Sequence, residues 1–170
     1  MKATASELAR VAEKEALLPY HGKNVGEKTN IDPLIAHFPK WNVSDADDKW
    51  CAAFVYHSCA AAGFEIPYSP DECITCSLAG CGGWDEYAIG DKRIGYFKGT
   101  SSFTPQRGDI VLYDRVFCGK EHDHIGIVLK VTDTQIVTAE GNIGGVSKIV
   151  TRERDDHIRA YIRFPDGYRY

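Results

Sequence analysis

The 170-residue sequence has no continuous apolar run long enough to cross a membrane, and no basic run that would grip a phosphate backbone. Asp and Glu outnumber Lys and Arg by 24 to 20. We therefore expect neither membrane insertion nor a nucleic-acid partner. The chain also lacks an internal repeat and a long linker rich in Pro, Ser or Gly. These absences predict one soluble, monomeric domain that spans residues 1–170.

Residues 1–20 do not show the pattern expected of a secretion signal. Residues 1–20 alternate charged residues with Ala and Leu, which predicts an amphipathic helix over about residues 4–18 rather than an apolar signal core. The catalytic core is expected over about residues 45–165. The sequence therefore predicts synthesis in the cytoplasm without export by the usual signal route.

Among the residues that are present, Cys51 has the clearest chemical potential. It lies near the start of a small, apolar segment, residues 50–62, that ends at Gly63. Residues 44–48 contain several candidate N-caps, so we expect a helix of about three turns with Cys51 in its first turn. A helix N-terminus and a nearby imidazole both lower the pKa of a thiol, and the thiolate is the nucleophile.

The base for Cys51 must come from another part of the chain. His57 lies six residues further along the expected helix and points away from Cys51. His124 begins an apolar, β-branched segment, residues 124–131, that predicts a strand. Gly126 shares a face with His124 and leaves room for another group to approach. A histidine that only begins a strand is the alternative, and pairing with Cys51 makes it the weaker one.

A third element follows at residues 135–142. Residues 135–139 predict a short strand that ends in a polar turn, Glu140-Gly141-Asn142. A hairpin would bring Glu140 beside His124, where a carboxylate fixes the tautomer and orientation of the ring. Asn142 would orient the same ring or donate to the substrate. Taken alone, the turn is better explained as a solvated loop, since Gly-Asn is common turn chemistry.

Together these segments resemble the CHAP family of cysteine, histidine-dependent amidohydrolases and peptidases, relatives of the NlpC-type and papain-like enzymes. The matching segments are residues 50–55, 105–111, 123–128 and 140–142. Each match is weak alone, and their spaced combination is specific. The resemblance runs from the N-terminal helix to about Arg163, nearly the whole chain.

The resemblance implies roles for four residues and a substrate. Cys51 would be the nucleophile, His124 the general base and later acid, and Glu140 and Asn142 the groups that hold the histidine. The substrate would be peptidoglycan. The enzyme would act either as an N-acetylmuramoyl-L-alanine amidase or as an endopeptidase of the stem or cross-bridge. Such an enzyme without a signal would reach the wall as a phage-type lysin or as an excised domain of a secreted protein. A cysteine amidase for a non-wall amide and a catalytically silent binding module stay open as alternatives.

The expected fold is α+β, a papain-like CHAP fold with N-terminal helices on an antiparallel sheet of five or six strands. The helices are expected over residues 4–18, 33–38, 50–62 and 71–78. The strands are expected over residues 109–113, 124–131, 135–139, 146–151 and 158–163.

The segment over residues 80–106 is long, irregular and rich in Gly and aromatics. One hypothesis makes it a wall of the substrate groove, and we assign Trp50, Trp84 and Tyr96 as candidate substrate contacts. The alternative is that the aromatics cover the junction of helices and sheet.

No metal or cofactor is expected. Besides Cys51 the chain has an odd number of cysteines, which argues against a complete disulfide framework. Cys59 is expected in the core. Acidic residues before Cys51 are expected to cap a helix rather than bind calcium, because few oxygen ligands follow them. These are Asp45, Asp47 and Asp48, and the cysteines weighed as a zinc site are Cys73, Cys76, Cys81 and Cys118.

Overall fold

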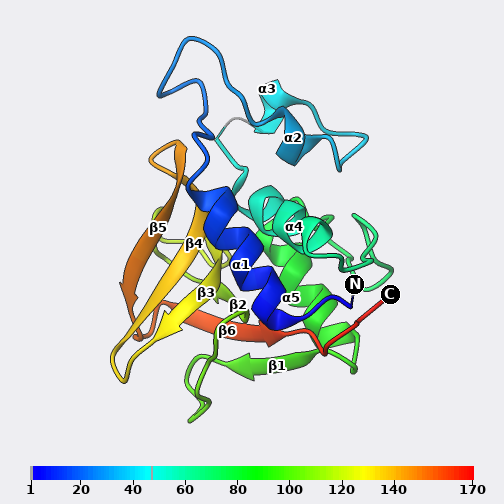
Figure 1. Cartoon of the computed structure of the whole chain (residues 1–170), viewed down its shortest axis with the longest axis vertical. Helices are drawn as coiled ribbons and strands as arrows, with labels where there is room; N and C mark the ends of the chain where they lie inside the picture. Colours follow the sequence, from blue (N-terminus) through cyan, green and yellow to red (C-terminus); the bar gives the residue numbers. More distant parts are fainter. Residues whose placement is uncertain (1, 47) are drawn as a thin grey trace.

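The computed structural model describes residues 2–46 and 48–170, and its fold is α+β. Five helices in this part of the chain precede or flank a six-stranded sheet, as Figure 1 shows. The helices are α1 (Ala5–Ala16), α2 (Asp32–Ile35), α3 (Val43–Ala46), α4 (Cys51–Ala61) and α5 (Cys81–Gly90). The strands are β1 (Gly95–Lys98), β2 (Ile110–Tyr113), β3 (His124–Val131), β4 (Gln135–Ile143), β5 (Val146–Glu153) and β6 (Ile158–Arg163).

The sheet has the strand order β1-β6-β2-β3-β4-β5, and every neighbouring pair is antiparallel. The predicted fold class is confirmed, and the expected bounds of β3 and β6 match the structure. The two ends of the chain meet, because the Gly167 amide donates to the Ala3 carbonyl (Figure 1). No helix in the described residues has the length and apolarity that a membrane span requires.

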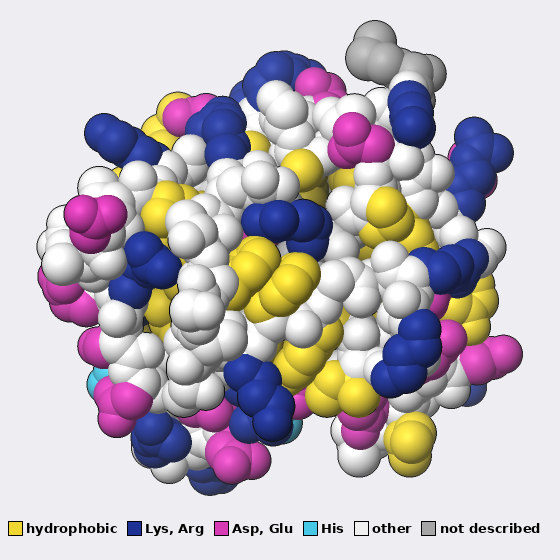
Figure 2. Space-filling view, turned by 90° about the horizontal axis from the view of Figure 1, so that it is seen from below, with side chains coloured by type: hydrophobic (Ala, Val, Ile, Leu, Met, Phe, Trp, Pro, Cys, Tyr) yellow, Lys and Arg dark blue, Asp and Glu magenta, His cyan; other side chains and the backbone are white. Residues whose placement is uncertain are grey.

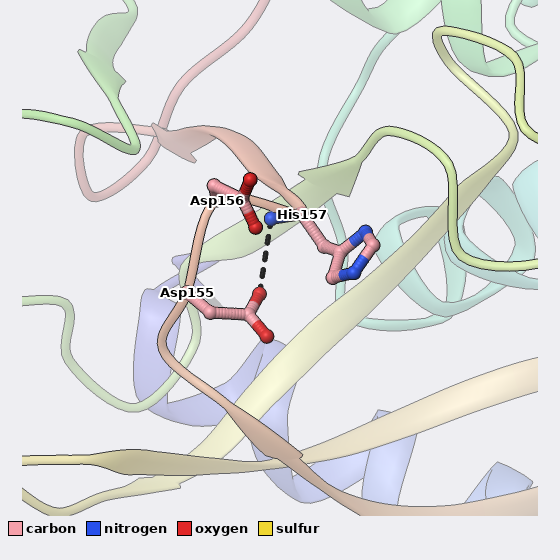
Figure 3. A group of neighbouring side chains, drawn as sticks. All are labelled: Asp155, Asp156 and His157. Carbon is pink, nitrogen blue, oxygen red and sulfur yellow. Dashed lines mark hydrogen bonds between the residues drawn. The ribbon is translucent and has the colours of Figure 1, made fainter.

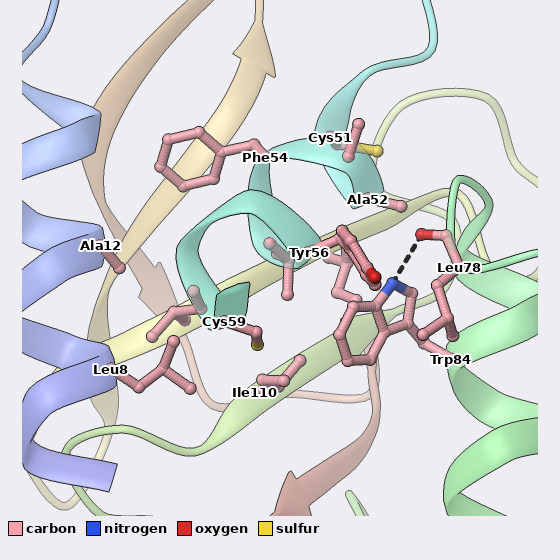
Figure 4. Packing of buried hydrophobic residues seen from close by; sticks show 14 of the residues in the cluster. Leu8, Ala12, Cys51, Ala52, Phe54, Tyr56, Cys59, Leu78, Trp84 and Ile110 are labelled. Carbon is pink, nitrogen blue, oxygen red and sulfur yellow. Dashed lines mark hydrogen bonds between the residues drawn. The ribbon is translucent and has the colours of Figure 1, made fainter. Parts of the chain in front are cut away.

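The main core lies between the helices and one face of the sheet. Leu8 of α1, Phe54 and Cys59 of α4, and Ile110 of β2 meet there, as Figure 4 shows. Most of α4 is buried, including Ala52 and Ala53, so this helix is apolar nearly all round rather than along a single stripe. A central, fully packed helix gives its first residue a fixed position.

A smaller apolar cluster covers the opposite face of the sheet. It includes Val111, Val128 and Tyr161, with Phe97 and Phe103 stacked beside them at a centroid distance of 3.8 Å. Figure 2 views the molecule from below Figure 1, where hydrophobic side chains lie between Lys and Arg side chains. The sheet is therefore covered by apolar groups on both faces.

The expected helix over residues 71–78 is absent, and the segment consists of turns. Its backbone is satisfied from outside, because Glu86 of α5 accepts hydrogen bonds from the Ile74 and Thr75 amides. Ile74 is exposed and Leu78 alone is fully buried, so the segment lacks the repeated apolar contacts that would support a helix. The region expected to be irregular, residues 80–106, instead contains α5 and β1.

The expected capping of α4 by the acidic segment is also absent. Asn42 caps α3, accepting from the Asp45 amide and donating to its carboxylate. No side chain caps α4, whose N-cap residue is Trp50. Asp47 lies outside the described residues. The first amides of α4 therefore stay available to a group at its N-terminus.

Candidate active site

Cys51 is the first residue of α4, and only 9% of it is exposed. Its sulfur lies at the helix end, whereas Cys59 points into the core (Figure 4). The position is set by close packing of α4 on β4: a Cβ at Gly141 would lie 2.6 Å from Cβ of Phe54 and 3.0 Å from Trp50. Glycine at 141 thus lets the helix approach the strand that carries the acid.

His124 is the first residue of β3, and its side chain faces Glu140 of β4. Its Nε2 lies 2.7 Å from Oε2 of Glu140, and both side chains are almost completely buried. Nε2 is occupied in this way, which leaves Nδ1 as the ring nitrogen for Cys51, and the His124 and Cys51 side chains shift each other's pKa. This is the arrangement in which a carboxylate fixes the ring that serves a nucleophile.

Glu140 is held by more than His124. Arg152 of β5 donates from Nε to Oε1 and from Nη2 to Oε2, each at 2.6 Å. The Thr138 hydroxyl donates to Oε1 at 2.5 Å. Gly126 provides the space, since a Cβ there would lie 2.8 Å from Cγ of Glu140. The group that approaches Gly126 is therefore the Glu140 side chain.

The charges of Glu140 and His124 follow from these contacts. Burial alone would raise the pKa of Glu140, but the bonds from Arg152 and His124 outweigh it and lower the pKa to about 2. Burial opposes the charged form of His124, yet the bonds to Cys51 and Glu140 raise its pKa to about 9. The protein therefore holds His124 as an imidazolium at neutral pH.

Cys51 completes an ion pair with that imidazolium. The neighbouring Cys81 thiol, 3.7 Å away sulfur to sulfur, lowers the pKa of Cys51, and the bonds to His124 and the Ala52 amide add to this against the cost of burial. The pKa of the Cys51 thiol lies well below its ordinary value. A thiolate paired with an imidazolium is ready to attack a carbonyl.

The ion pair faces a cavity of about 640 Å³. Cys51, Cys81 and His124 line it together with several aromatic side chains and charged groups of both signs. The aromatics are Phe38, Trp41, Tyr68 and Phe117, and the charged groups include Lys40, Asp48, Lys49 and Asp123. A cavity of this size with mixed polar and aromatic walls suits an extended polar substrate.

The family comparison decides what this arrangement is. A model of the family described as "CHAP domain" matches residues 43–142, more than half of the chain. The chain belongs to the CHAP family. This family is part of the papain-like class of cysteine peptidases and amidases.

The CHAP domain also resembles solved structures. The crystal structure of Ly7917 has a TM-score of 0.51 at 13% identity, with coverage of 95% of this chain and 61% of that one. Ly7917 with the hydrolyzing product of MDP has a TM-score of 0.45 at 15% identity, covering 95% and 62%. The chain thus spans about three fifths of these proteins, and the first likeness shows the fold alone. A comparison with curated proteins gives no match.

Asn142 of the CHAP domain lines the same cavity as Cys51 and His124. Its side-chain amide donates to the Asp48 carbonyl at 2.8 Å rather than to the His124 ring. The residue has a φ of 59°, in the left-handed region that Asn tolerates. Asn142 therefore ties the end of β4 to the segment that leads into α4.

The three candidate substrate contacts lie away from the cavity, and this differs from the expectation. Trp50 and Trp84 are fully buried, and the Trp84 indole donates to the Leu78 carbonyl (Figure 4). The Tyr96 hydroxyl donates to Asp85 at 2.6 Å. These aromatics pack the helix and sheet junction because their rings bury more apolar area there than a cavity wall offers. The aromatic walls come instead from residues that the sequence did not single out, including Trp41 and Tyr68.

A metal centre receives little support in the described residues. The cysteines of the zinc alternative form no cluster of ligand atoms there, and Cys73 instead donates to the Gly83 carbonyl. The group that does gather is Asp155, Asp156 and His157, with ligand atoms within 4.8 Å of one another (Figure 3). It lies on the turn before β6 and is mostly exposed, away from Cys51.

Two residues that contact the candidate site were not predicted for it. The sequence indicates Cys81 only as a possible zinc ligand and does not single out Arg152. Arg152 had a usable signal, because it directly follows the strand expected over residues 146–151, and pairing of that strand with residues 135–139 brings it near Glu140. Cys81 had none, since its contact with Cys51 joins two helices 30 residues apart.

Proposed function

We propose that the protein is a peptidoglycan hydrolase that cleaves an amide bond through a thioester on Cys51. The observation that supports this most is the buried set of Cys51, His124 and Glu140 opening on one large cavity. Family membership supports the hydrolase class. The bond would be the N-acetylmuramoyl-L-alanine amide or a peptide bond of the stem or cross-bridge.

The mechanism follows from the charges of the site. The Cys51 thiolate attacks the amide carbonyl carbon, and the Cys51 backbone N–H at the helix N-terminus donates to the developing oxyanion. His124 gives its proton to the leaving amine as the C–N bond breaks. Neutral His124 then takes one proton from water, whose oxygen attacks the thioester; the C–S bond breaks, the carboxylic acid leaves, and the thiolate and imidazolium are restored.

Glu140 stays ionised through both steps. Its carboxylate faces the imidazolium and stabilises it, while Arg152 keeps the acid from taking the proton itself. Glu140 is therefore a positioning residue for His124.

The test is digestion of purified peptidoglycan from several Gram-positive bacteria, with new amino groups counted and fragments identified by mass spectrometry. Cys51→Ala should release no fragments. Cys59→Ala is the matched control, because Cys59 is a second buried cysteine of α4 and lies in the core, out of the cavity. Fragment release by wild type and Cys59→Ala would name the bond. No release by a folded wild type whose Cys51 alkylates readily would overturn the wall substrate and point to another amide.

A further inference from the structure

Amide hydrolysis uses Cys81 only to lower the pKa of Cys51 and gives its thiol no covalent step. Cys81 is the first residue of α5, as Cys51 is of α4, and the two helix starts bring their sulfur atoms to 3.7 Å. Both residues are buried, both are free thiols, and both line the same cavity. The chain therefore places a second thiol in van der Waals contact with its nucleophile.

We propose that Cys81 is a resolving cysteine, which forms a reversible disulfide with Cys51 when a hydroperoxide enters the cavity. A disulfide bond is about 2 Å long, so the sulfur atoms need to close by less than about 2 Å. This modification would switch the enzyme off and shield the nucleophile from irreversible oxidation. The inference stands on the thiol pair and does not depend on which amide is cut.

The chemistry balances with a hydroperoxide as the oxidant. The Cys51 thiolate attacks the O–O bond, the distal oxygen stays on sulfur as a sulfenic acid, and the leaving oxygen takes the proton of His124 to become water or an alcohol. The Cys81 thiol then attacks the Cys51 sulfur. Its proton leaves with the sulfenic oxygen as water, and the S–S bond forms. Two thiols are oxidised and one hydroperoxide is reduced.

The two thiols are suited to different steps. Cys51 is the thiolate that reacts first, while the contact with Cys51 and burial raise the pKa of Cys81 and keep it protonated until a sulfenic acid forms beside it. Cys59 is out of reach in the core. Cys76 is a competitor, since it is exposed, lines the cavity and lies against Gly80, next to Cys81. It therefore serves as the control.

The experiment exposes reduced full-length protein to hydrogen peroxide, blocks free thiols with iodoacetamide and measures intact mass and peptides. No Lys or Arg lies between Lys49 and Lys92, so trypsin would leave both cysteines in one peptide. Chymotrypsin cuts between Cys51, Cys59, Cys76 and Cys81, because aromatic residues or Leu78 separate them. Wild type should lose two hydrogens and yield a peptide pair that joins Cys51 to Cys81. Dithiothreitol should restore alkylation of Cys51.

The variants separate the resolving role from simple proximity. In Cys81→Ser, peroxide should drive Cys51 to the sulfinic acid, which dithiothreitol does not restore. Cys76→Ser should keep the Cys51–Cys81 pair. A Cys51–Cys76 pair, or sulfinic Cys51 in wild type as fast as in Cys81→Ser, would overturn the proposal. If Cys81→Ser fails to fold by circular dichroism, Cys81→Ala replaces it, and the wild-type peptide map decides alone if both fail. Every readout is a thiol mass, so the result is independent of peptidoglycan cleavage.

Discussion

Arg152 holds Glu140 in a two-point ion pair, from Nε to Oε1 and from Nη2 to Oε2. The carboxylate is fully buried, and the guanidinium side chain is 17% exposed. A buried carboxylate without such a partner would take up a proton, and a protonated Glu140 could not stabilise the His124 imidazolium. The cation on β5 thus sets the charge of the histidine on β3.

Replacing Arg152 should therefore damage both stability and catalysis. Arg152→Gln leaves a buried charge poorly compensated, and we expect a loss of about 3–5 kcal/mol in unfolding free energy. Per folded molecule, kcat should fall because Glu140 no longer fixes His124. Arg152→Lys keeps the positive charge but loses the two-point geometry of the guanidinium. Its unfolding free energy and kcat should lie between those of wild type and Arg152→Gln. Denaturant unfolding and initial rates measure both effects.

Lys148→Gln is the matched control for Arg152. Lys148 lies opposite Glu140 in the β4–β5 register, but its side chain is exposed. Its loss removes one positive charge from the same strand without touching the carboxylate. If this variant lost as much activity as Arg152→Gln, general electrostatics rather than the ion pair would explain the effect.

The thiolate–imidazolium pair predicts a distinct pH dependence of alkylation. The pKa of Cys51 is lowered, so the thiolate persists as pH falls below the ordinary thiol pKa of about 8.5. The pKa of His124 is raised to about 9, so the imidazolium is lost only as pH rises through that value. We expect iodoacetamide to react with Cys51 well below pH 8.5, and kcat/KM to decline near pH 9.

Glu140→Gln tests the cause of that profile. Without the carboxylate, the pKa of His124 should drop and that of Cys51 should rise, because the ion pair loses its support. Cys59 gives the internal reference, since burial raises the pKa of its thiol above the ordinary range. A single ionisation of Cys51 at the ordinary thiol pKa in wild type would contradict an ion pair.

Gly126→Ala should impair catalysis with little effect on the fold. The new Cβ would lie 2.8 Å from Cγ of Glu140, whose carboxylate Arg152 and Thr138 hold in place. The acid must shift, and a shift of about 1 Å costs roughly 100-fold in rate. Gly82→Ala is the control, because its nearest neighbours would be at 3.7 Å, an ordinary contact. Comparable kcat for the two variants would show that the space at Gly126 is unimportant.

Substitution of two tryptophans should distinguish a core-packing role from a substrate-binding role. Trp84→Ala empties a fully buried site and should cost about 3–5 kcal/mol, with unchanged turnover per folded molecule. Trp41→Ala should instead raise KM, since Trp41 is partly exposed and lines the cavity. Thermal unfolding and peptidoglycan kinetics distinguish them. A reversed pattern would place the substrate on the α5 side of the molecule.

Strands β2 to β6 and the helix α4 were predictable because local patterns determine them, whereas β1 was not expected. β3 is largely apolar and β-branched, and Gly63, just after α4, adopts a φ of 89°. The helix α5 was missed because it begins with Cys81-Gly82-Gly83, and glycine disfavours helices. It forms because burial of Trp84 and Tyr87 outweighs that preference.

In the candidate site, too, some residues could be predicted from the sequence, whereas others depend on tertiary contacts. The sequence order of Cys51, His124 and Glu140 identified the residues whose contacts the structure describes. Their supporting partners depend on contacts between segments far apart, such as Cys51 with Cys81 and Asp48 with Asn142. Aromatic residues were hardest to place, because Trp84 and Trp41 differ in burial and not in local pattern. Burial is a property of the whole fold.

The position of β6 has a consequence for how the enzyme comes into being. β6 is last in sequence, yet it lies between β1 and β2 in the sheet. A growing chain that has reached only β5 has Cys51, His124, Glu140 and Arg152 but a gap inside its sheet. The strand that closes the gap leaves the ribosome last. The sheet that joins β1 to the strands carrying His124, Glu140 and Arg152 is therefore complete only once residues 158–163 have been made.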